Sequence, residues 1–319
     1  MSIPEPLTPV LPPPAAEPLF SPRKVRLGIT PTGWSNSDDP GIDLVPPIGF
    51  RQILSEMALA GYQGTQMSGK FPGDPQNLRR ELTLRGLTIS EPWVGTFFSI
   101  GNQRDSFSAF ERELAFMQAI GERTLVVAEL GGAVHQQPID PLANRPIWND
   151  SQWRAVLEGL NAMGQRARVA GMTLAYHPHV GTGIENAADI ERLLHSTEPE
   201  VVSLLLDTGH LTYVGVDPLE VARRYAGRIG HVHLKNVRAE TLRLAEAEGW
   251  SFLKAIRRGV FTVPGDPQGC IAFEPIFQTL AEAHYEGWLM VEAEQDPNQA
   301  DPLTYALIAR HFLRRTTGL

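Results

Sequence analysis

The sequence has little of what marks secreted, membrane-spanning or nucleic-acid-binding proteins. Cys270 is the only cysteine among 319 residues, which excludes an intramolecular disulfide and favours a reducing compartment. No apolar run approaches the roughly 20 residues of a membrane span. The N-terminus lacks the basic-then-apolar layout of a signal peptide. We therefore expect a cytoplasmic protein with no membrane partner.

Positive charge is scarce as well. The chain carries 28 lysines and arginines against 36 aspartates and glutamates, a formal net charge of -8. Because nucleic-acid binding usually needs a basic face, we expect no nucleic-acid partner. Hydrophobic residues make up 42% of the chain, which is enough for a full core and too many for a disordered protein.

Proline, in contrast, is concentrated at the N-terminus. Prolines recur within residues 1–22, at Pro4, Pro6, Pro9, Pro12, Pro13 and Pro14. Since proline interrupts helices and central strands, this segment is predicted to be an extended arm. A disordered tail and an arm that docks on a neighbouring subunit are both open. Residues 23–319 are predicted to form a single catalytic domain.

From Lys24 onward, short β-type runs alternate with longer amphipathic stretches. Eight strands are predicted, at 25–30, 64–68, 88–93, 124–128, 172–176, 201–206, 229–234 and 288–291. Helices are predicted at 48–60, 74–85, 107–120, 150–170, 187–195, 218–225, 273–284 and 303–313, and a longer insertion covers 236–269. Eight such alternations in a chain of this length predict an α/β fold, the (β/α)8 TIM barrel.

An open, doubly wound sheet is the main structural alternative. Such a sheet usually has a glycine-rich turn after its first strand. Residues 30–34 read TPTGW, which is not a dinucleotide-binding fingerprint. The barrel is therefore favoured.

Metal-ligating residue types follow three of the predicted strands. Asp207 follows a run of three leucines, Glu292 follows Leu-Met-Val, and His233 lies near the end of the seventh strand. Strand ends at one rim of a parallel barrel face the same cavity. Asp, His and Glu side chains that converge there would make an open site for a divalent cation. Taken singly, each has a plainer explanation, such as a helix cap or a salt bridge at the rim.

The seventh strand places several polar side chains on one face. His231 and His233 alternate with aliphatic residues, so both histidines point the same way, and Lys235 continues that face past the strand end. His233 is the better ligand candidate because it lies nearer the rim. His231 could support it or be a packed core histidine. Glu292 and Glu294 likewise share a side.

The fourth ligand is left open by spacing alone. His177 and His179 follow the predicted fifth strand and share a face, so either could bind the metal. Glu129, at the end of the predicted fourth strand, competes for the role. His210 lies three residues after Asp207, where it could face the same cavity.

Several motifs carry a family resemblance over roughly residues 25–313. They include GITP at 28–31, YHPHVGT at 176–182, DTGH at 207–210, HVHLKNVR at 231–238, GVFTVPGD at 259–266 and EAEQDP at 292–297. With these motifs the chain resembles the sugar isomerase/epimerase superfamily of xylose isomerase-like barrels. Within that superfamily it is most similar to the myo-inosose-2 dehydratase family of inositol catabolism.

The resemblance implies a metal-dependent lyase. A divalent cation, Mn²⁺ or Co²⁺ with Zn²⁺ or Mg²⁺ as alternatives, would be held by Asp207, His233, Glu292 and, where epimerases commonly have glutamate, His177. The substrate would be a small polyol or keto-sugar. The reaction would remove water from a keto-cyclitol such as 2-keto-myo-inositol through an enolate. Acid-base candidates are His210, Lys70, Lys235 and His179, and expected substrate contacts are Trp34, Asn36, Arg238 and Glu129.

Departures from the dehydratase pattern occur at Gly69, Pro178 and Asn236, where that family usually has Asn, His and Asp. They fall at the substrate rim and leave the exact substrate open. A metal-dependent ketose isomerase or epimerase and a non-catalytic sugar-binding barrel are the two alternative functions. A metal-dependent nuclease is disfavoured by the acidic charge. A homo-oligomer is left open.

Overall fold

The computed structural model describes residues 18–319. Residues 1–17, most of the predicted N-terminal arm, lie outside the described part of the chain, so the arm stays a prediction. At the start of the described chain, the backbone N–H of Leu19 donates to the carbonyl of Thr317 at 2.8 Å, and Phe20 is buried. The described chain thus begins packed against its own C-terminal helix.

The described strands form a nearly closed parallel barrel, which confirms the predicted fold. Its nine strands pair in the order β3-β2-β1-β11-β8-β7-β6-β5-β4. They are β1 (Val25–Ile29), β2 (Gly64–Gln66), β3 (Thr88–Glu91), β4 (Trp93–Thr96), β5 (Thr124–Glu129), β6 (Thr173–Tyr176), β7 (Ser203–Asp207), β8 (Ile229–Leu234) and β11 (Gly287–Val291).

A proline divides the third predicted strand in two. Only Pro92 separates β3 from β4, and these two strands are the ends of the pairing order. Because proline has no N–H to donate, the ladder breaks there: β3 pairs with β2, and β4 pairs with β5. The eight predicted positions therefore give nine strands.

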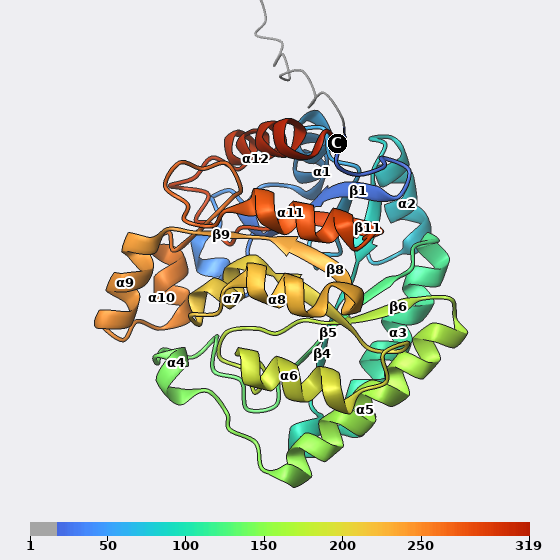
Figure 1. Ribbon diagram of the computed structural model, residues 1–319. Helices are drawn as coiled ribbons and strands as arrows, with labels where there is room; N and C mark the ends of the chain where they lie inside the picture. Colours follow the sequence, from blue (N-terminus) through green and yellow to red (C-terminus); the bar gives the residue numbers. More distant parts are fainter. Residues whose placement is uncertain (1–17) are drawn as a thin grey trace, which may run out of the picture.

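Helices surround the barrel, as Figure 1 shows. They are α1 (Phe50–Leu59), α2 (Pro75–Thr83), α3 (Gln103–Ile120), α5 (Asp150–Val169), α6 (Ala187–Ser196), α8 (Pro218–Tyr225), α11 (Phe273–Glu282) and α12 (Pro302–Thr317). Local signals set their ends. Asn149 and Asn186 each form a capping box at the start of α5 and α6, and Gly121 ends α3 with a positive φ of 92°.

The loops hold further elements that the sequence analysis did not identify. These are α4 (Pro141–Asn144), α7 (Thr208–Tyr213) and the 3-10 helices η1 (Pro31–Gly33), η2 (Pro40–Ile42), η3 (Phe98–Ile100) and η4 (Ala226–Arg228). The insertion at 236–269 is also structured. It contains β9 (Asn236–Val237), α9 (Ala239–Ala247), α10 (Phe252–Arg257) and β10 (Phe261–Thr262), with β9 and β10 antiparallel. In Figure 1, α9 and α10 project from the left of the barrel.

The inside of the barrel is mostly polar near one end. Outward-facing strand residues such as Val232 and Leu234 join the large core beneath the helices, whereas only a small buried cluster of Val126, Ala175 and Leu205 forms apart from it. The residues that alternate with Val232 and Leu234 are histidines and a lysine. This confirms that the two strand faces differ, and it leaves the polar face directed into the barrel.

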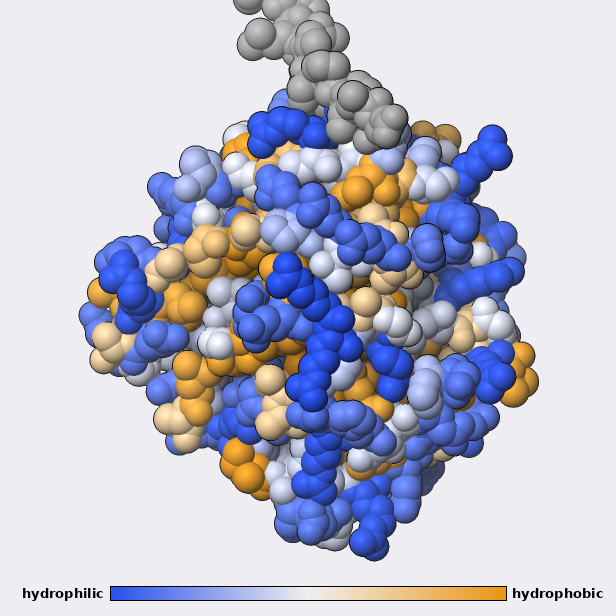
Figure 2. All heavy atoms as spheres, in the orientation of Figure 1, coloured by the Kyte–Doolittle hydropathy of each residue, from blue (hydrophilic) through white to orange (hydrophobic). Residues whose placement is uncertain are grey.

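The surface is mixed in character. Figure 2 shows one face on which hydrophilic side chains predominate and hydrophobic ones occupy small separate areas. Within residues 18–319, no helix is long and apolar enough to cross a lipid bilayer.

Arg238 joins the two ends of the insertion. Its guanidinium donates to the carbonyls of Gly259 (2.8 Å) and Phe261 (3.1 Å), and to the carboxylate of Asp266 (2.7 Å). These partners belong to the far end of the insertion, so Arg238 closes it onto its own beginning. It does not line the substrate cavity described below.

We expect Arg238→Met to lower the free energy of unfolding by about 3 kcal/mol, because it leaves two carbonyls without this donor and removes the cation paired with the buried Asp266 carboxylate. Urea denaturation would measure the change. Arg243→Met is the control: Arg243 is exposed on α9 and pairs with Glu240, so its loss should change stability by less than about 0.5 kcal/mol. Unchanged stability with a raised KM would instead favour the substrate contact that the sequence predicts for Arg238.

Candidate metal centre

A cavity of about 570 Å³ lies at the carboxyl ends of the strands. That is the rim where TIM barrels carry their sites, and the volume suits one small ligand. Its polar lining includes Thr32, Asn36, Gln66, His135, Gln136, His177, His179, His210, Glu292 and Glu294, and Trp93 adds an aromatic face.

Four of the predicted residues converge at the base of this cavity. Asp207 ends β7, His233 is the last but one residue of β8, and His177 and Glu292 directly follow β6 and β11. Each of the four offers a ligand atom within 4.8 Å of the others. Asp207 Oδ2 lies 3.3 Å from His177 Nε2 and 3.6 Å from His233 Nδ1. Glu292 Oε2 lies 2.7 Å from the same His233 nitrogen. All four side chains are buried, so this group could hold a metal ion.

Asp207 serves two structural purposes with its two oxygens. Its Oδ1 accepts the backbone N–H of Gly209 at 2.9 Å and of His210 at 2.8 Å, which caps helix α7. This leaves Oδ2 directed at the ligand group. The plainer explanation of Asp207 as a helix cap is therefore correct for one oxygen and compatible with a ligand role for the other.

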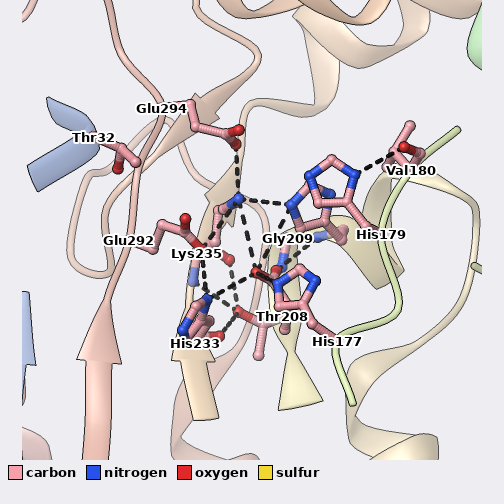
Figure 3. Close-up of polar contacts among 12 residues, drawn as sticks. Thr32, His177, His179, Val180, Thr208, Gly209, His233, Lys235, Glu292 and Glu294 are labelled. Carbon is pink, nitrogen blue, oxygen red and sulfur yellow. Dashed lines mark hydrogen bonds and ion pairs between the residues drawn. The ribbon is translucent and has the colours of Figure 1, made fainter. Parts of the chain in front are cut away.

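Lys235 lies at the centre of the polar contacts in Figure 3. Its Nζ is 2.7 Å from Glu294 Oε2, 3.3 Å from Glu292 Oε2, 3.7 Å from Asp207 Oδ2 and 2.9 Å from His210 Nε2. The side chain is fully buried and reaches this place past Gly209. A Cβ at Gly209 would lie 2.4 Å from Lys235 Cγ, so this close approach requires glycine.

Mutual attraction keeps most of these buried groups charged. Burial would raise the pKa of Asp207, but Lys235 and the nearby histidines outweigh it and hold that pKa well below its usual value. Burial would lower the pKa of Lys235, but the carboxylates of Asp207, Glu292 and Glu294 raise it overall. Glu294 differs: burial and Glu292 raise its pKa to about 7 despite Lys235. At neutral pH it is therefore partly protonated.

His210 and His179 form the cavity wall next to Lys235, with ring centroids 3.9 Å apart. Burial, each other's proximity and Lys235 hold the pKa of His210 well below its usual value, and burial with neighbouring histidines does the same for His179. Both are therefore neutral near pH 7. His179 Nδ1 is 2.9 Å from the carbonyl of Val180 and donates to it, which leaves its Nε2 lone pair free.

Glu129, the competitor for the fourth ligand position, lies outside this group. It lies on the same face of β5 as Leu125 and Val127, which pack in the core between the barrel and the helices. Its carboxylate accepts hydrogen bonds from Thr96 Oγ1 (2.7 Å) and Ser99 Oγ (2.8 Å), and from the backbone N–H groups of residues 98, 99 and 131. It neither joins the four ligands nor lines the cavity, so a substrate contact is not supported either.

The other predicted substrate and acid-base residues divide in two. Asn36 lines the cavity, and its buried Nδ2 has no hydrogen-bond partner in the protein. Trp34 instead packs in the core and donates to Glu56 at 2.6 Å. Lys70 pairs with Asp43 at 2.9 Å, outside the cavity lining. The structure therefore brings Asn36 to the site and leaves Trp34 and Lys70 away from it.

Some residues of the site were missed by the sequence analysis. His135, Gln136 and Trp93 line the cavity. The first two come from the long loop after β5, which carries no periodic signal. Glu91 ends β3 and lies fully buried beside His233. It was missed because the third strand was predicted to run through it to residue 93.

We expect Lys235→Met to bind Mn²⁺ at least ~10-fold more tightly, because it removes a positive charge close to the ligand oxygens. Isothermal titration of the metal-free protein would measure this. Asp207→Asn should weaken binding by ~100-fold or more, and Lys254→Met, a surface lysine, should change nothing. Weaker binding by Lys235→Met would show that the lysine is needed to hold the ligands in place.

Comparisons with known proteins agree with this geometry. The family model described as xylose isomerase-like TIM barrel matches residues 50–316. The curated inosose dehydratase of Geobacillus thermodenitrificans (strain NG80-2) is 44% identical over 302 residues, which is 94% of this chain and 100% of the relative. That of Clostridium beijerinckii (strain ATCC 51743 / NCIMB 8052) is 42% identical over 301 residues, with the same coverage.

Solved structures share the fold at low sequence identity. L-ribulose 3-epimerase superposes with a TM-score of 0.66 at 20% identity, over 91% of this chain and 93% of that one. The probable 3-DHS dehydratase involved in petrobactin synthesis from Bacillus anthracis gives 0.64 at 15% identity, over 89% and 97%. The fold, the family model and the relatives agree: this chain belongs to the xylose isomerase-like TIM barrel family, on the branch of the inosose dehydratases.

Proposed function

We propose that this chain is a metal-dependent hydro-lyase that removes water from a keto-cyclitol such as 2-keto-myo-inositol. The relatives that match it over their whole length are named inosose dehydratases, which supports dehydration. The observation that carries the metal dependence is the convergence of His177, Asp207, His233 and Glu292 at the base of the cavity. Two neutral histidines, His179 and His210, lie beside that group and line the same cavity.

The ligand atoms fit a divalent ion of borderline hardness. Two imidazole nitrogens and two carboxylate oxygens suit Mn²⁺ or Co²⁺, with Zn²⁺ and Mg²⁺ as alternatives. Burial lowers the pKa of His233, but Glu292 and Asp207 raise it well above its usual value overall, so a cation bound at Nδ1 would take the place of a proton that these carboxylates already favour. When bound, such an ion would polarise the substrate ketone and acidify the adjoining carbon.

His179 is the proposed base. Its Nδ1 donates to the carbonyl of Val180, so the neutral ring keeps Nε2 free to accept the proton from the carbon next to the ketone. Loss of that proton gives an enolate. His210, another acid-base candidate, is less suited to be the base because its Nε2 already accepts a hydrogen bond from Lys235.

His210 is the proposed acid. Its Nε2 accepts a hydrogen bond from Lys235, and its Nδ1 has no protein partner. The proton therefore sits on Nδ1, which is buried in the free protein. The proposed role requires bound substrate to place its β-hydroxyl against this nitrogen, while Lys235 supplies a proton to Nε2. Lys235 does not line the cavity and acts through His210 and Glu294.

The opposite wall would bind the hydroxyl groups of the ring. Asn36, Gln66 and Gln136 line it with amide groups, and the Asn36 Nδ2 lacks a partner within the protein. Such donors and acceptors suit a polyol, and a single six-membered ring fits the cavity volume.

The cytoplasmic location, the absence of nucleic-acid and membrane partners, a homo-oligomer and the single catalytic domain stay predictions.

Chelation tests the metal dependence and the reaction together. We expect the purified protein to convert 2-keto-myo-inositol to a dione that absorbs in the ultraviolet, to lose at least ~90% of this activity after chelation, and to regain it with Mn²⁺ or Co²⁺. Asp207→Asn and Glu292→Gln should be inactive yet folded by circular dichroism.

Other results would favour the alternative functions. A ketohexose converted without ultraviolet absorbance would indicate an isomerase or epimerase. Ligand affinity that survives chelation, with no turnover, would indicate a sugar-binding barrel.

Isotope exchange separates the base from the acid. In D₂O, His179→Asn should lose both deuterium incorporation next to the ketone and water loss, each by ~100-fold or more, because no proton is removed. His210→Asn should still incorporate deuterium while water loss slows to a similar degree. Mass spectrometry of recovered substrate would measure the exchange, and normal exchange in His179→Asn would contradict the assignment.

A further inference from the structure

A second group of titratable side chains lies deeper in the barrel and shares His233 with the four proposed ligands. Glu91 ends β3, and His231 and His233 belong to β8; all three are fully buried. Glu91 Oε1 is 3.4 Å from His233 Nε2, and its Oε2 is 3.4 Å from His231 Nε2. These are close contacts between charged or polar groups, and neither Glu91 oxygen has a hydrogen-bond partner among the described residues.

Glu91 reaches this place through an irregularity in its strand. Thr65 pairs with Ile89, but the next residue of β2, Gln66, pairs with Glu91. One residue of β3 is therefore skipped, and a bulge of this kind reverses the face on which later side chains lie. Ile89 packs in the outer core, whereas Glu91 faces the barrel interior.

The imidazole of His233 lies between the two groups. Its Nδ1 faces Glu292 at 2.7 Å and Asp207 at 3.6 Å, and its Nε2 faces Glu91. A neutral imidazole carries one proton, so Nδ1 can bind a metal only when the proton is on Nε2. The acceptor opposite Nε2 is the Glu91 carboxylate.

We propose that Glu91 is a positioning residue of the metal centre: it holds the Nε2 proton of His233, so that Nδ1 is presented to the ion with the ring correctly oriented. His231 braces the second oxygen of Glu91. Carboxylates behind metal-bound histidines act in this way in other proteins. The inference rests on the proposed metal centre.

A comparison with Glu129 separates this role from a merely structural one. Both glutamates end barrel strands and are fully buried. The Glu129 carboxylate accepts hydrogen bonds from five donors and contacts none of the four proposed ligands. Among the described residues, the oxygens of Glu91 contact His231 and His233, and His233 is one of the proposed ligands. A buried carboxylate that only stabilises the fold would need several hydrogen-bond donors, as Glu129 has. Glu91 lacks such donors and faces histidines instead.

Titration with Mn²⁺ of the metal-free wild type, Glu91→Gln and Glu129→Gln tests the proposal. We expect Glu91→Gln to bind Mn²⁺ about 10-fold to 100-fold more weakly. Glu129→Gln should keep the wild-type affinity even if its thermal stability falls. Equal affinity in the wild type and Glu91→Gln would overturn the inference. Failure of the wild type to bind Mn²⁺ would overturn the metal centre itself, so the two failures are distinguishable.

A measurement on the wild type keeps the test decisive if Glu91→Gln does not fold. In protein labelled with ¹⁵N-histidine and loaded with Zn²⁺ as a diamagnetic probe, the His233 ring should show a metal-bound Nδ1 and a protonated Nε2. The Nε2 proton should exchange slowly with water. A metal-bound Nε2 with a proton on Nδ1 would refute the role of Glu91.

Discussion

The balance of buried charge around Lys235 is the constraint on which the site depends. Asp207, Glu292 and Glu294 surround one ammonium group inside the barrel, where ionised carboxylates need nearby positive charge. Lys235 compensates for part of this negative charge. Burial lowers the pKa of His233, but Glu292 and Asp207 raise it well above its usual value overall, so the protonated imidazole compensates for more, and a divalent cation at Nδ1 would replace that proton. The same cluster separates the proposed roles of its side chains. In the proposed mechanism, the carboxylates would hold the ion, Lys235 donates a hydrogen bond to His210, and the neutral His179 and His210 would transfer protons.

The fold was largely predictable because the barrel repeats one simple pattern. Eight apolar runs separated by amphipathic stretches predict eight strands and their helices, and the structure confirms them. Two features were not predictable. Pro92 divides the predicted third strand into β3 and β4. Together these two strands occupy one position in the barrel, β3 pairing with β2 and β4 with β5. The insertion at 236–269 forms its own elements because it packs on Tyr213 in α7, a partner distant in sequence.

The alternation of side chains along the strands explains which of the predicted site residues the structure brings together and which it does not. A polar residue at a strand end predicted Asp207, and the structure brings that side chain into a four-residue group. The same alternation could have excluded Glu129 as a ligand, since Leu125 and Val127 lie on its face of the strand and pack outward against the helices. The same rule fails for Glu91, because the bulge in β3 turns it inward. Trp34 was misplaced for a related reason: it follows η1, and no periodicity determines where a loop side chain points.

The most direct test of the central claim is anomalous X-ray diffraction from crystals grown with Mn²⁺. The account predicts a single strong anomalous peak between His177 Nε2, Asp207 Oδ2, His233 Nδ1 and Glu292 Oε2, with each atom at roughly 2.0–2.3 Å. It also predicts that Glu91 lies within hydrogen-bond distance of His233 Nε2. A peak among other residues, or no ion at this site at saturating Mn²⁺, would contradict it.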